Sequence, residues 1–402
     1  MTAAHATLRR EQGEDRSPSP VDLGALAGDL DALQAKLREG AGEADLRHLR
    51  KIEFLGRAAS ALGYATAWIM PNPLAIAALS LGRFVRWTGV AHPVCHRGYD
   101  RLQGVPDSRR GTVFALGRRR WLDWADWLDP RAWIEEHNLQ HHYRLNETAD
   151  PDLVERNLGW LRRSSLPRWL RLALVPLMAA SWKYVYYAPS SLEALARAEA
   201  RRERTTEAPA DAGEVLERRW SSRGLWSFLP HSSLRLWLRC WAPYLALHFV
   251  ILPLAFLPLG WWAVFSVLIN SLLAEALTNV HAFVTIVPNH AGADLYRFEG
   301  RTHSRGEFYL RQILGSTNYR CGGDLNDLLH GWLNYQIEHH LWPEMSLLQY
   351  RRAQPQVREI CARHGLPYVQ ESVWRRCAKA VAVMVGDASL RRWPEDFEVS
   401  RG

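Results

Sequence analysis

Two long apolar stretches, Phe54 to Val90 and Trp237 to Val287, constrain the fold of this chain more than any other feature. Proline interrupts each stretch near its middle, at Pro71 and Pro73 in the first and at Pro258 in the second. Each half is long enough to cross a bilayer once as an α-helix, so each stretch predicts a helical hairpin. The sequence therefore predicts four transmembrane helices, at about residues 54–70, 73–90, 241–257 and 261–287.

The distribution of charge predicts which way the hairpins face. Both interruptions lack charged residues, whereas the segments that flank the stretches carry nearly all of the lysines and arginines. Positive charge gathers on the cytoplasmic side of membrane proteins. We expect an all-α, multi-pass integral membrane protein with both termini and a polar helical cap in the cytoplasm. Two buried hairpins of a soluble protein are the alternative, since Arg57, Arg83 and Arg86 lie inside the first stretch.

The chain divides into an N-terminal cytosolic segment at 1–52, a main domain at 53–369 and a C-terminal cytosolic tail at 370–402. The N-terminal segment has no apolar run of the kind found in signal peptides, so the N-terminus is expected to start in the cytosol. Its leucines alternate in spacings of three and four, which predicts one helix that packs on the cap: Leu23, Leu26, Leu30, Leu33 and Leu37. Residues 190–222 predict a solvated, partly helical insertion without chemistry of its own.

Composition narrows the classes of function. The formal net charge is +8, but the arginines do not form a nucleic-acid module, so a basic membrane surface explains the charge better and no nucleic acid is expected as a partner. Five scattered cysteines without a Cys-x-x-Cys spacing argue against a disulfide framework or a thiolate zinc site and fit a reducing compartment. Trp121, Trp124 and Trp127 recur at helical spacing, which predicts a helix on the membrane surface, with buried aromatic packing as the alternative.

Histidine is the residue type that indicates chemistry. Of the 16 histidines, seven fall in three tight clusters: His92 and His96; His137, His141 and His142; His339 and His340. Histidines four apart on a helix share a face, so His92 with His96, and His137 with His141, can each present two imidazoles to one metal. On such helices His142 and His340 point elsewhere and can serve a second metal. Metal-free interfacial histidines are the alternative for any single cluster.

The number of imidazoles indicates how many metals the chain binds. Imidazole suits zinc, copper, iron and nickel, so the type of ligand does not select the metal. Seven imidazoles exceed the needs of one four-coordinate zinc, which indicates two metals. A zinc peptidase needs glutamate directly after the first histidine of a His-Glu-x-x-His helix, and Pro93 and Asn138 occupy those positions here.

The clusters resemble the three histidine boxes of the membrane fatty-acid desaturase superfamily. Box one reads His-Pro-Val-Cys-His-Arg-Gly-Tyr-Asp from His92, box two His-Asn-Leu-Gln-His-His from His137, and box three Asn-Tyr-Gln-Ile-Glu-His-His-Leu-Trp-Pro from Asn334. The third box is similar to that of acyl-lipid and front-end desaturases, many of which have histidine where this chain has Gln336. The resemblance covers roughly Phe54 to Val369 and leaves out the N-terminal segment and the insertion.

The resemblance implies four transmembrane helices under a cytosolic cap that holds two iron ions. The implied ligands are His92, His96, His137, His141, His142, His339 and His340. His290, in the sequence Pro-Asn-His-Ala-Gly, is a further implied ligand, and Gln336 is a candidate. His281 is a weaker candidate, because it lies nine residues before His290 and so on nearly the opposite face of the helix. Nearby carboxylates can orient these imidazoles, with ordinary surface acids as the alternative: Glu135, Glu136, Asp150, Asp152 and Glu338.

The activity that the resemblance implies is desaturation of a membrane lipid or another acyl substrate with O₂ and two electrons. This chain lacks the His-Pro-Gly-Gly motif of the cytochrome b5 domain that front-end relatives often carry, so a separate donor of ferredoxin or cytochrome b5 type is expected. A di-iron lipid hydroxylase of the same superfamily is one alternative. A metal transporter is another, but it needs ionisable ligands near the bilayer midplane, where only His248 and Glu275 qualify.

Overall fold

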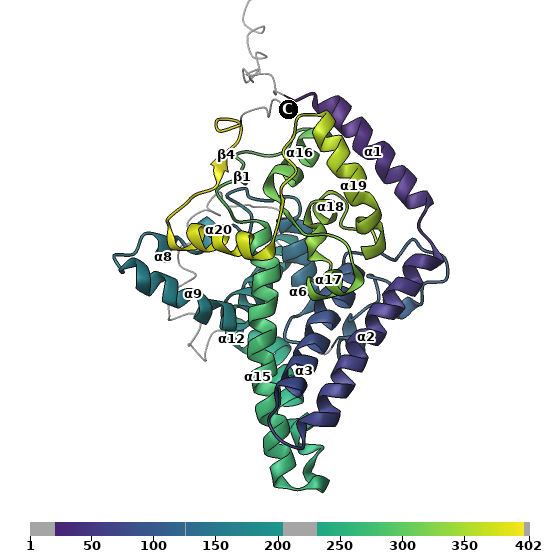
Figure 1. Ribbon diagram of the computed structural model, residues 1–402, viewed down its shortest axis with the longest axis vertical. Coiled ribbons are helices and arrows are strands. Elements are labelled where there is room, and N and C mark those ends of the chain that lie inside the picture. The colour runs from purple at the N-terminus through teal and green to yellow at the C-terminus, as the bar shows by residue number, and fades with distance from the viewer. Residues whose placement is uncertain (1–20, 125, 204–230, 398–402) are drawn as a thin grey trace, which may run out of the picture.

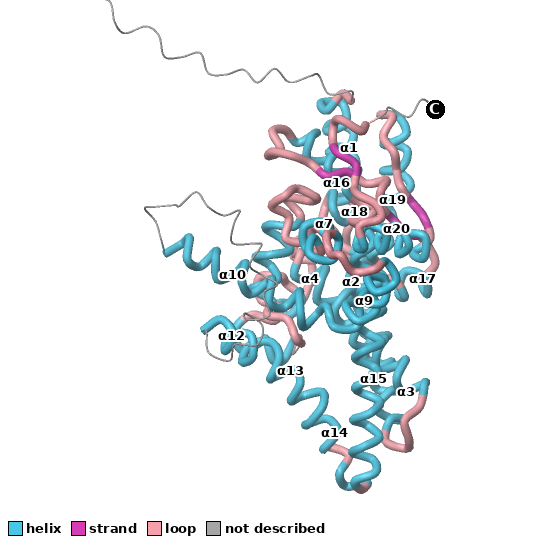
Figure 2. Tube along the Cα trace, turned by 90° about the vertical axis from the view of Figure 1, so that its left-hand side faces the viewer, coloured by secondary structure: helices cyan, strands magenta, loops and turns pink. Residues whose placement is uncertain are grey.

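The computed structural model describes residues 21–124, 126–203 and 231–397. The described chain is mostly helical, which confirms the all-α class. Figures 1 and 2 show an elongated molecule in which a narrow stalk of long helices leads into a broad cap. Short parallel strand pairs tie parts of the cap together: β1 (Tyr296–Arg297) with β4 (Arg391–Arg392), and β2 (Asn318–Tyr319) with β3 (Gln370–Glu371).

The stalk is built on the antiparallel helices α2 (Glu43–Ala67) and α3 (Pro73–Val85), which pack along α15 (Trp261–Ile286). Asn72 ends the turn between α2 and α3, because its side chain accepts a hydrogen bond from the Ala75 amide at 2.8 Å. Asn270 of α15 holds the same turn by accepting the Asn72 amide at 2.9 Å. Glycine lets α2 and α3 approach closely: a Cβ on Gly82 would lie 2.1 Å from Ser60 Oγ.

Three helices of the described chain are long and apolar enough to cross a membrane: Pro73–Cys95, Leu234–Leu259 and Trp261–Asn289. They correspond to the predicted spans at 73–90, 241–257 and 261–287. The first predicted span, 54–70, falls on α2 and is not among the three, because Glu53, Arg57 and the charged residues before them interrupt the apolar sequence of that helix. The structure thus supports a membrane protein without establishing a fourth crossing.

Two of these long helices contain π-helical turns. The helix that begins with α3 continues through the π-helical turn η1 (Arg86–Ala91) into α4 (His92–Cys95). The helix before α15 alternates in the same way through α12 (His231–Leu236), η7 (Trp237–Trp241), α13 (Ala242–Ala246), η8 (Leu247–Ile251) and α14 (Leu252–Leu254). A 3₁₀ turn, η9 (Leu257–Leu259), links it to α15. Apolar side chains such as Val250, Ile251 and Leu254 are exposed on it, as expected of a helix that faces lipid.

The cap is made of shorter elements from the middle and the end of the chain. Those from the middle are η2 (Asp107–Arg109), η3 (Gly117–Arg119), α5 (Arg120–Asp123), α6 (Pro130–Trp133), η4 (Ile134–His141), α7 (Val154–Asn157), α8 (Gly159–Arg162), α9 (Arg168–Trp182), η5 (Lys183–Tyr187) and α10 (Ala188–Glu203). Those from the end are η10 (Val287–Asn289), α16 (Arg305–Gly315), α17 (Asp324–Leu329), η11 (Leu333–Tyr335), α18 (Gln336–Leu341), α19 (Leu347–Arg363) and α20 (Val373–Val385).

The predicted N-terminal helix is confirmed as α1 (Leu23–Glu39), capped by Asp22. The last four leucines of its stripe are buried and Leu23 is half-buried, and the helix packs against α16 and α19. The predicted surface helix at the tryptophans is wrong, because α5 ends at Asp123 and both Trp124 and Trp127 are buried, so the packing alternative applies to them. The predicted insertion at 190–222 begins within α10, and its part from residue 204 onward lies outside the described residues.

Candidate metal centre

Eight imidazoles meet where the stalk enters the cap, and all eight side chains are buried. The end of the stalk helix supplies His92 and His96, and η4 with the residue after it supplies His137, His141 and His142. His290 follows η10, and α18 supplies His339 and His340. Segments far apart in the sequence therefore converge on one point, as the box spacing predicts.

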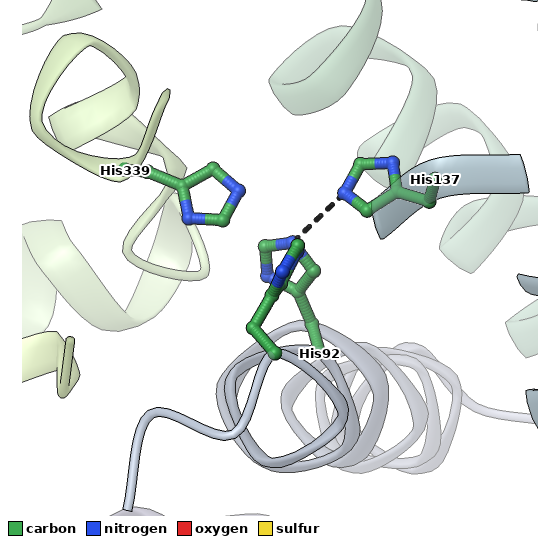
Figure 3. A group of neighbouring side chains, drawn as sticks. His92, His137 and His339 are labelled. Carbon is green, nitrogen blue, oxygen red and sulfur yellow. Dashed lines mark hydrogen bonds between the residues drawn. The ribbon is translucent and has the colours of Figure 1, made fainter. Parts of the chain in front are cut away.

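The first group of imidazoles comes from three elements. His92, His96, His137 and His339 each offer a ring nitrogen, and these atoms lie within 4.8 Å of one another. Figure 3 shows His92, His137 and His339 facing a common centre, with 3.4 Å between Nε2 of His92 and Nε2 of His137. Such an arrangement of nitrogen atoms matches a metal site better than a packed core, because two ring nitrogens without a proton between them repel.

The second group lies beside the first. His141, His290 and His340 offer ring nitrogens within 4.8 Å of one another, and His142 forms a similar set with His339 and His340. The Gln336 amide Nε2 donates to Nε2 of His290 at 2.9 Å. The described residues thus contain two adjoining groups of nitrogen donors, with Gln336 at the edge of the second.

The π-helical geometry of η4 determines which imidazoles of the second box lie beside each other. In a π-helix residues five apart share a face, and the His142 amide donates to the His137 carbonyl at 3.1 Å. His142 Nε2 accordingly lies 3.3 Å from His137 Nε2. The prediction that His142 points away from His137 is wrong, because it assumed an α-helix. His141 lies beside His137 and forms a set with it and Asp152, but it also faces His290 and His340.

Four imidazoles are oriented by hydrogen bonds from Nδ1. These bonds run from His141 to Asp150 at 2.9 Å, from His290 to the Gly315 carbonyl at 3.2 Å, from His339 to the Tyr350 hydroxyl at 3.1 Å, and from His340 to Gln312 Oε1 at 3.0 Å. Each acceptor fixes the ring and leaves the lone pair on Nε2, as in proteins whose histidines bind metal; in His290 that lone pair accepts from Gln336. Among the described residues, Nε2 of His339 and Nε2 of His340 have no hydrogen-bond partner.

Burial keeps most of these rings neutral. It lowers the pKa of His96, His137, His142, His339 and His340 well below the ordinary value, and neighbouring imidazoles lower it further. Burial lowers the pKa of His290 to about 3. His141 is the exception: burial lowers its pKa, but Asp150 and Asp152 outweigh that effect and raise it. Neutral imidazole is the form that binds a metal, so this set of donors fits one.

The predicted orienting carboxylates differ in what they contact. Asp150 accepts from His141, and Asp152 Oδ2 lies 3.7 Å from the same ring nitrogen. Glu338 accepts from Asn318 at 2.8 Å and Tyr368 at 2.7 Å, and burial raises its pKa to about 7. Glu135 pairs with Arg202 at 3.3 Å. Glu136 is completely buried.

His281 and Glu275, two further ionisable candidates, belong to none of the described groups that could hold a metal. His281, the weaker ligand candidate, stacks on Phe84 and bonds through Nε2 to the Leu329 carbonyl at 2.7 Å. Glu275, one of the midplane candidates, forms ion pairs with Arg83 at 3.2 Å and Lys183 at 2.7 Å. These residues are already satisfied by protein groups.

An apolar cavity of about 180 Å³ opens beside the imidazoles. Histidines of both groups take part in its lining: His92, His137, His141 and His290. Aromatic and aliphatic side chains such as Trp87, Trp182, Phe283, Ile286 and Met384 make up most of the remainder, together with a few polar residues that include Asp152 and Gln336. The cavity therefore suits an apolar chain placed against the imidazoles.

Sequence reasoning identified Asp150 but missed the other groups that orient the rings. Tyr350 and Gln312 accept from His339 and His340 but belong to other helices. Trp133 stacks on His137 with ring centroids 4.6 Å apart, and its indole donates to the Tyr187 hydroxyl. Trp133 lies four residues before His137, so helical spacing could have indicated that their two rings are neighbours.

Comparison with known proteins agrees with this geometry. The family model for fatty acid desaturases matches residues 66–372. The chain is 27% identical to the NADPH-dependent stearoyl-CoA 9-desaturase of Mycobacterium tuberculosis, over 95% of this chain and 84% of that protein. It is 27% identical to the acyl-lipid (7-3)-desaturase of Rebecca salina, over 64% and 54%. It is 29% identical to the Delta(8)-fatty-acid desaturase 2 of Arabidopsis thaliana, over 34% and 30%.

Proposed function

This chain belongs to the fatty acid desaturase family, and on that premise we propose that it inserts a double bond into a fatty acyl chain with O₂ and two electrons at a histidine-held di-iron centre. The observation that carries the proposal is the convergence of eight buried imidazoles beside an apolar cavity that four of them line. Bound iron would supply the oxidising power needed to remove hydrogen from an unactivated methylene group. The residues of the chain would hold the iron and position the substrate.

We assign the ligands by the two groups of nitrogen atoms. His92, His96, His137 and His339 would hold one iron, and His141, His290 and His340 would hold the other, with His142 between them. Gln336 is a further candidate, because turning its amide by half a revolution presents Oε1 in place of the Nε2 that now faces His290. His281 drops out, since Leu329 occupies its Nε2. Asp150 and Asp152 would support His141.

The apolar cavity would hold the substrate. An acyl chain has no polar group near the reacting carbons, so its position depends on shape and on exclusion of water. Trp182, Phe283 and Met384 belong to its mostly apolar lining and would contact the acyl chain. The names of the relatives include both stearoyl-CoA and acyl-lipid substrates, and either carrier fits the proposal.

A separate protein of ferredoxin or cytochrome b5 type would supply the electrons. The name of the mycobacterial relative includes NADPH dependence, and we extend to this chain NADPH as the ultimate electron source. The basic cap segments would face that donor in the cytoplasm. This orientation requires α2 to act as a fourth crossing beside α3, which its close packing along that helix supports.

Lipid analysis of cells that express the protein tests this proposal. Wild-type protein should produce a fatty acid with one more double bond than its precursor, whereas His339→Ala should abolish the product because one group loses a donor. Gln336→His should retain more activity than His339→Ala. His303→Ala is the matched control, since His303 is exposed and lies outside both groups. A hydroxylated product would reassign the chain as a hydroxylase, and full activity of His339→Ala would refute the ligand assignment.

A further inference from the structure

A second cavity, of about 420 Å³, lies along the stalk helix and is separate from the apolar one. Val85, Arg86 and Val90 of that helix line it, whereas Trp87, Thr88 and His92 line the apolar cavity. The helix backbone therefore separates the two. One face of α2 and the segment before Trp124 complete the lining of the second cavity. Glu53, Gly56, Arg57 and Ser60 belong to α2, and the segment before Trp124 contributes Ser108, Arg109, Phe114, Arg119, Leu122 and Asp123.

The lining of this cavity is positively charged. Four arginines face two carboxylates, Glu53 and Asp123, which leaves an excess of two positive charges. Both carboxylates are already paired, Glu53 with Arg109 and Asp123 with Arg119 through two bonds of 2.7 Å. In the part of the chain that the structure describes, neither Arg57 nor Arg86 has a carboxylate within ion-pair distance. Arg86 donates instead to the main-chain oxygen of Asp123.

Two exposed guanidinium groups that have no carboxylate partner among the described residues and border a partly open cavity favour a tetrahedral oxyanion. A guanidinium presents N–H donors in a planar fork that matches phosphate oxygens, and it holds its charge at any physiological pH. At about 420 Å³ the cavity is large enough for a phosphate with its substituents. A bound phosphate group would therefore account for both the size and the charge of the cavity.

The position of the cavity identifies the carrier of that phosphate. Arg57 and Arg86 lie on the order of 20 Å along their helices from the turn at Asn72, about two-thirds of the thickness of the hydrocarbon core, so in a four-crossing arrangement their long side chains would reach the interface opposite that turn. Phe54 is 68% exposed on the cavity-bearing end of α2, and Leu122 at the rim is 76% exposed. The charged cavity matches the headgroup of a lipid, and the apolar side chains beside it match the acyl chains.

We propose that this cavity binds the phosphate of an anionic phospholipid of the bilayer, with Arg57 and Arg86 as the phosphate ligands and the acyl chains against Phe54 and Leu122. The site is distinct from the proposed acyl substrate site, because the stalk helix lies between them. Its occupant would bridge α2, α3 and the loop that ends at Trp124, and so would brace the entry of the stalk into the cap.

Lipid binding to the detergent-purified full chain tests the proposal without any activity measurement. Native mass spectrometry would follow retention of dioleoylphosphatidylglycerol, with dioleoylphosphatidylcholine as the neutral headgroup. We expect wild-type protein to retain the anionic lipid preferentially and Arg57→Gln to bind it about tenfold more weakly, since one charge-assisted pair is lost. Arg57→Lys should restore part of the affinity. Arg57 is exposed, so the substitution should leave the thermal unfolding midpoint unchanged.

Arg118→Gln is the matched control, because Arg118 is exposed in the same loop and does not line the cavity. It removes the same charge and should bind the lipid as wild type does. Equal retention by wild type and Arg57→Gln, or equal losses in Arg57→Gln and Arg118→Gln, would overturn the site. Displacement of the lipid by millimolar inorganic phosphate would overturn the lipid assignment and reassign the site to a soluble phosphate compound.

Discussion

Each imidazole of the centre can offer a metal only one of its two ring nitrogens, and in His141, His290, His339 and His340 a hydrogen bond from Nδ1 decides which. His339 donates Nδ1–H to the Tyr350 hydroxyl, which in turn donates to the Pro343 carbonyl at 2.9 Å. The chain of hydrogen bonds therefore has one direction, and it leaves Nε2 of His339 as the donor atom. The same logic applies to His340 through Gln312.

Tyr350→Phe tests this orienting role. The substitution keeps the buried ring and removes the hydroxyl, so we expect the fold to persist while His339 loses its fixed tautomer. Iron should be lost about 10 to 100 times more readily to a chelator, in line with other supporting hydrogen bonds to metal-binding histidines. Chelator titration of the iron-loaded protein measures this. Iron retention equal to that of wild type would show that Tyr350 has a packing role alone.

The sequence predicted the imidazoles but not the residues that orient them. Short spacing within each box identified the histidines, because helical neighbours share a face. Tyr350 and Gln312 lie 11 and 28 residues from the histidines they hold, and no local pattern links positions on separate helices. Asp150 could be predicted because it lies only nine residues from His141.

At the scale of the elements, the stalk depends on close contact between α2 and α3. Glycine at positions 56, 63 and 82 removes side chains from the contact, and a Cβ at Gly63 would lie 2.6 Å from Leu79 Cγ. Lipid tails are as apolar as the helices, so close packing and hydrogen bonds, rather than the hydrophobic effect, hold such helices together. The small residues are therefore structural requirements of the hairpin.

Gly82→Ala should destabilise the hairpin by about 1 to 3 kcal/mol, because the new Cβ meets Ser60 Oγ and the Gly56 carbonyl. The double variant Gly82→Ala with Ser60→Ala should regain part of that loss, since it removes the nearer clash. Thermal unfolding in detergent measures both. Gly28→Ala on α1 is the control: a Cβ there meets nothing within 4 Å, so the change should be neutral or stabilising. An unchanged midpoint for Gly82→Ala would contradict the close approach.

The elements themselves were predictable only in part. Apolar length and the proline interruptions predicted the hairpin helices, and the leucine stripe predicted α1. The π-helical turns were not predictable, because one extra residue in a turn leaves no signature in composition or spacing. Their consequence is large in η4, where the extra residue places His142, rather than His141 alone, beside His137.

At the scale of the whole molecule, the number of membrane crossings decides where the centre lies. Within the described ranges three helices meet the length and apolarity of a span, and α2 would be the fourth. An even number of crossings places both termini on one side of the membrane, whereas three crossings place them on opposite sides. Sequence hydropathy could not decide this, since α2 combines charged and apolar residues along one helix.

Reporter fusions decide between these arrangements. We expect reporters placed before Met1 and after Gly402 both to read as cytoplasmic, because the basic segments of the chain should remain on that side. The measurement is the activity of a side-sensitive reporter at each end of the full chain. Reporters that read on opposite sides would refute the four-crossing arrangement and leave α2 as a helix of the cap.

The metal content of the purified protein tests the central claim most directly. After expression with supplementary iron, we predict about two iron ions per chain, because the two groups of imidazoles form two adjoining sets of donors. His339→Ala should lower this content, whereas His303→Ala should not. Elemental analysis of the three proteins at matched concentration gives the result. One tightly held zinc per chain without iron, in wild-type protein, would contradict the di-iron centre and the oxidative chemistry that depends on it.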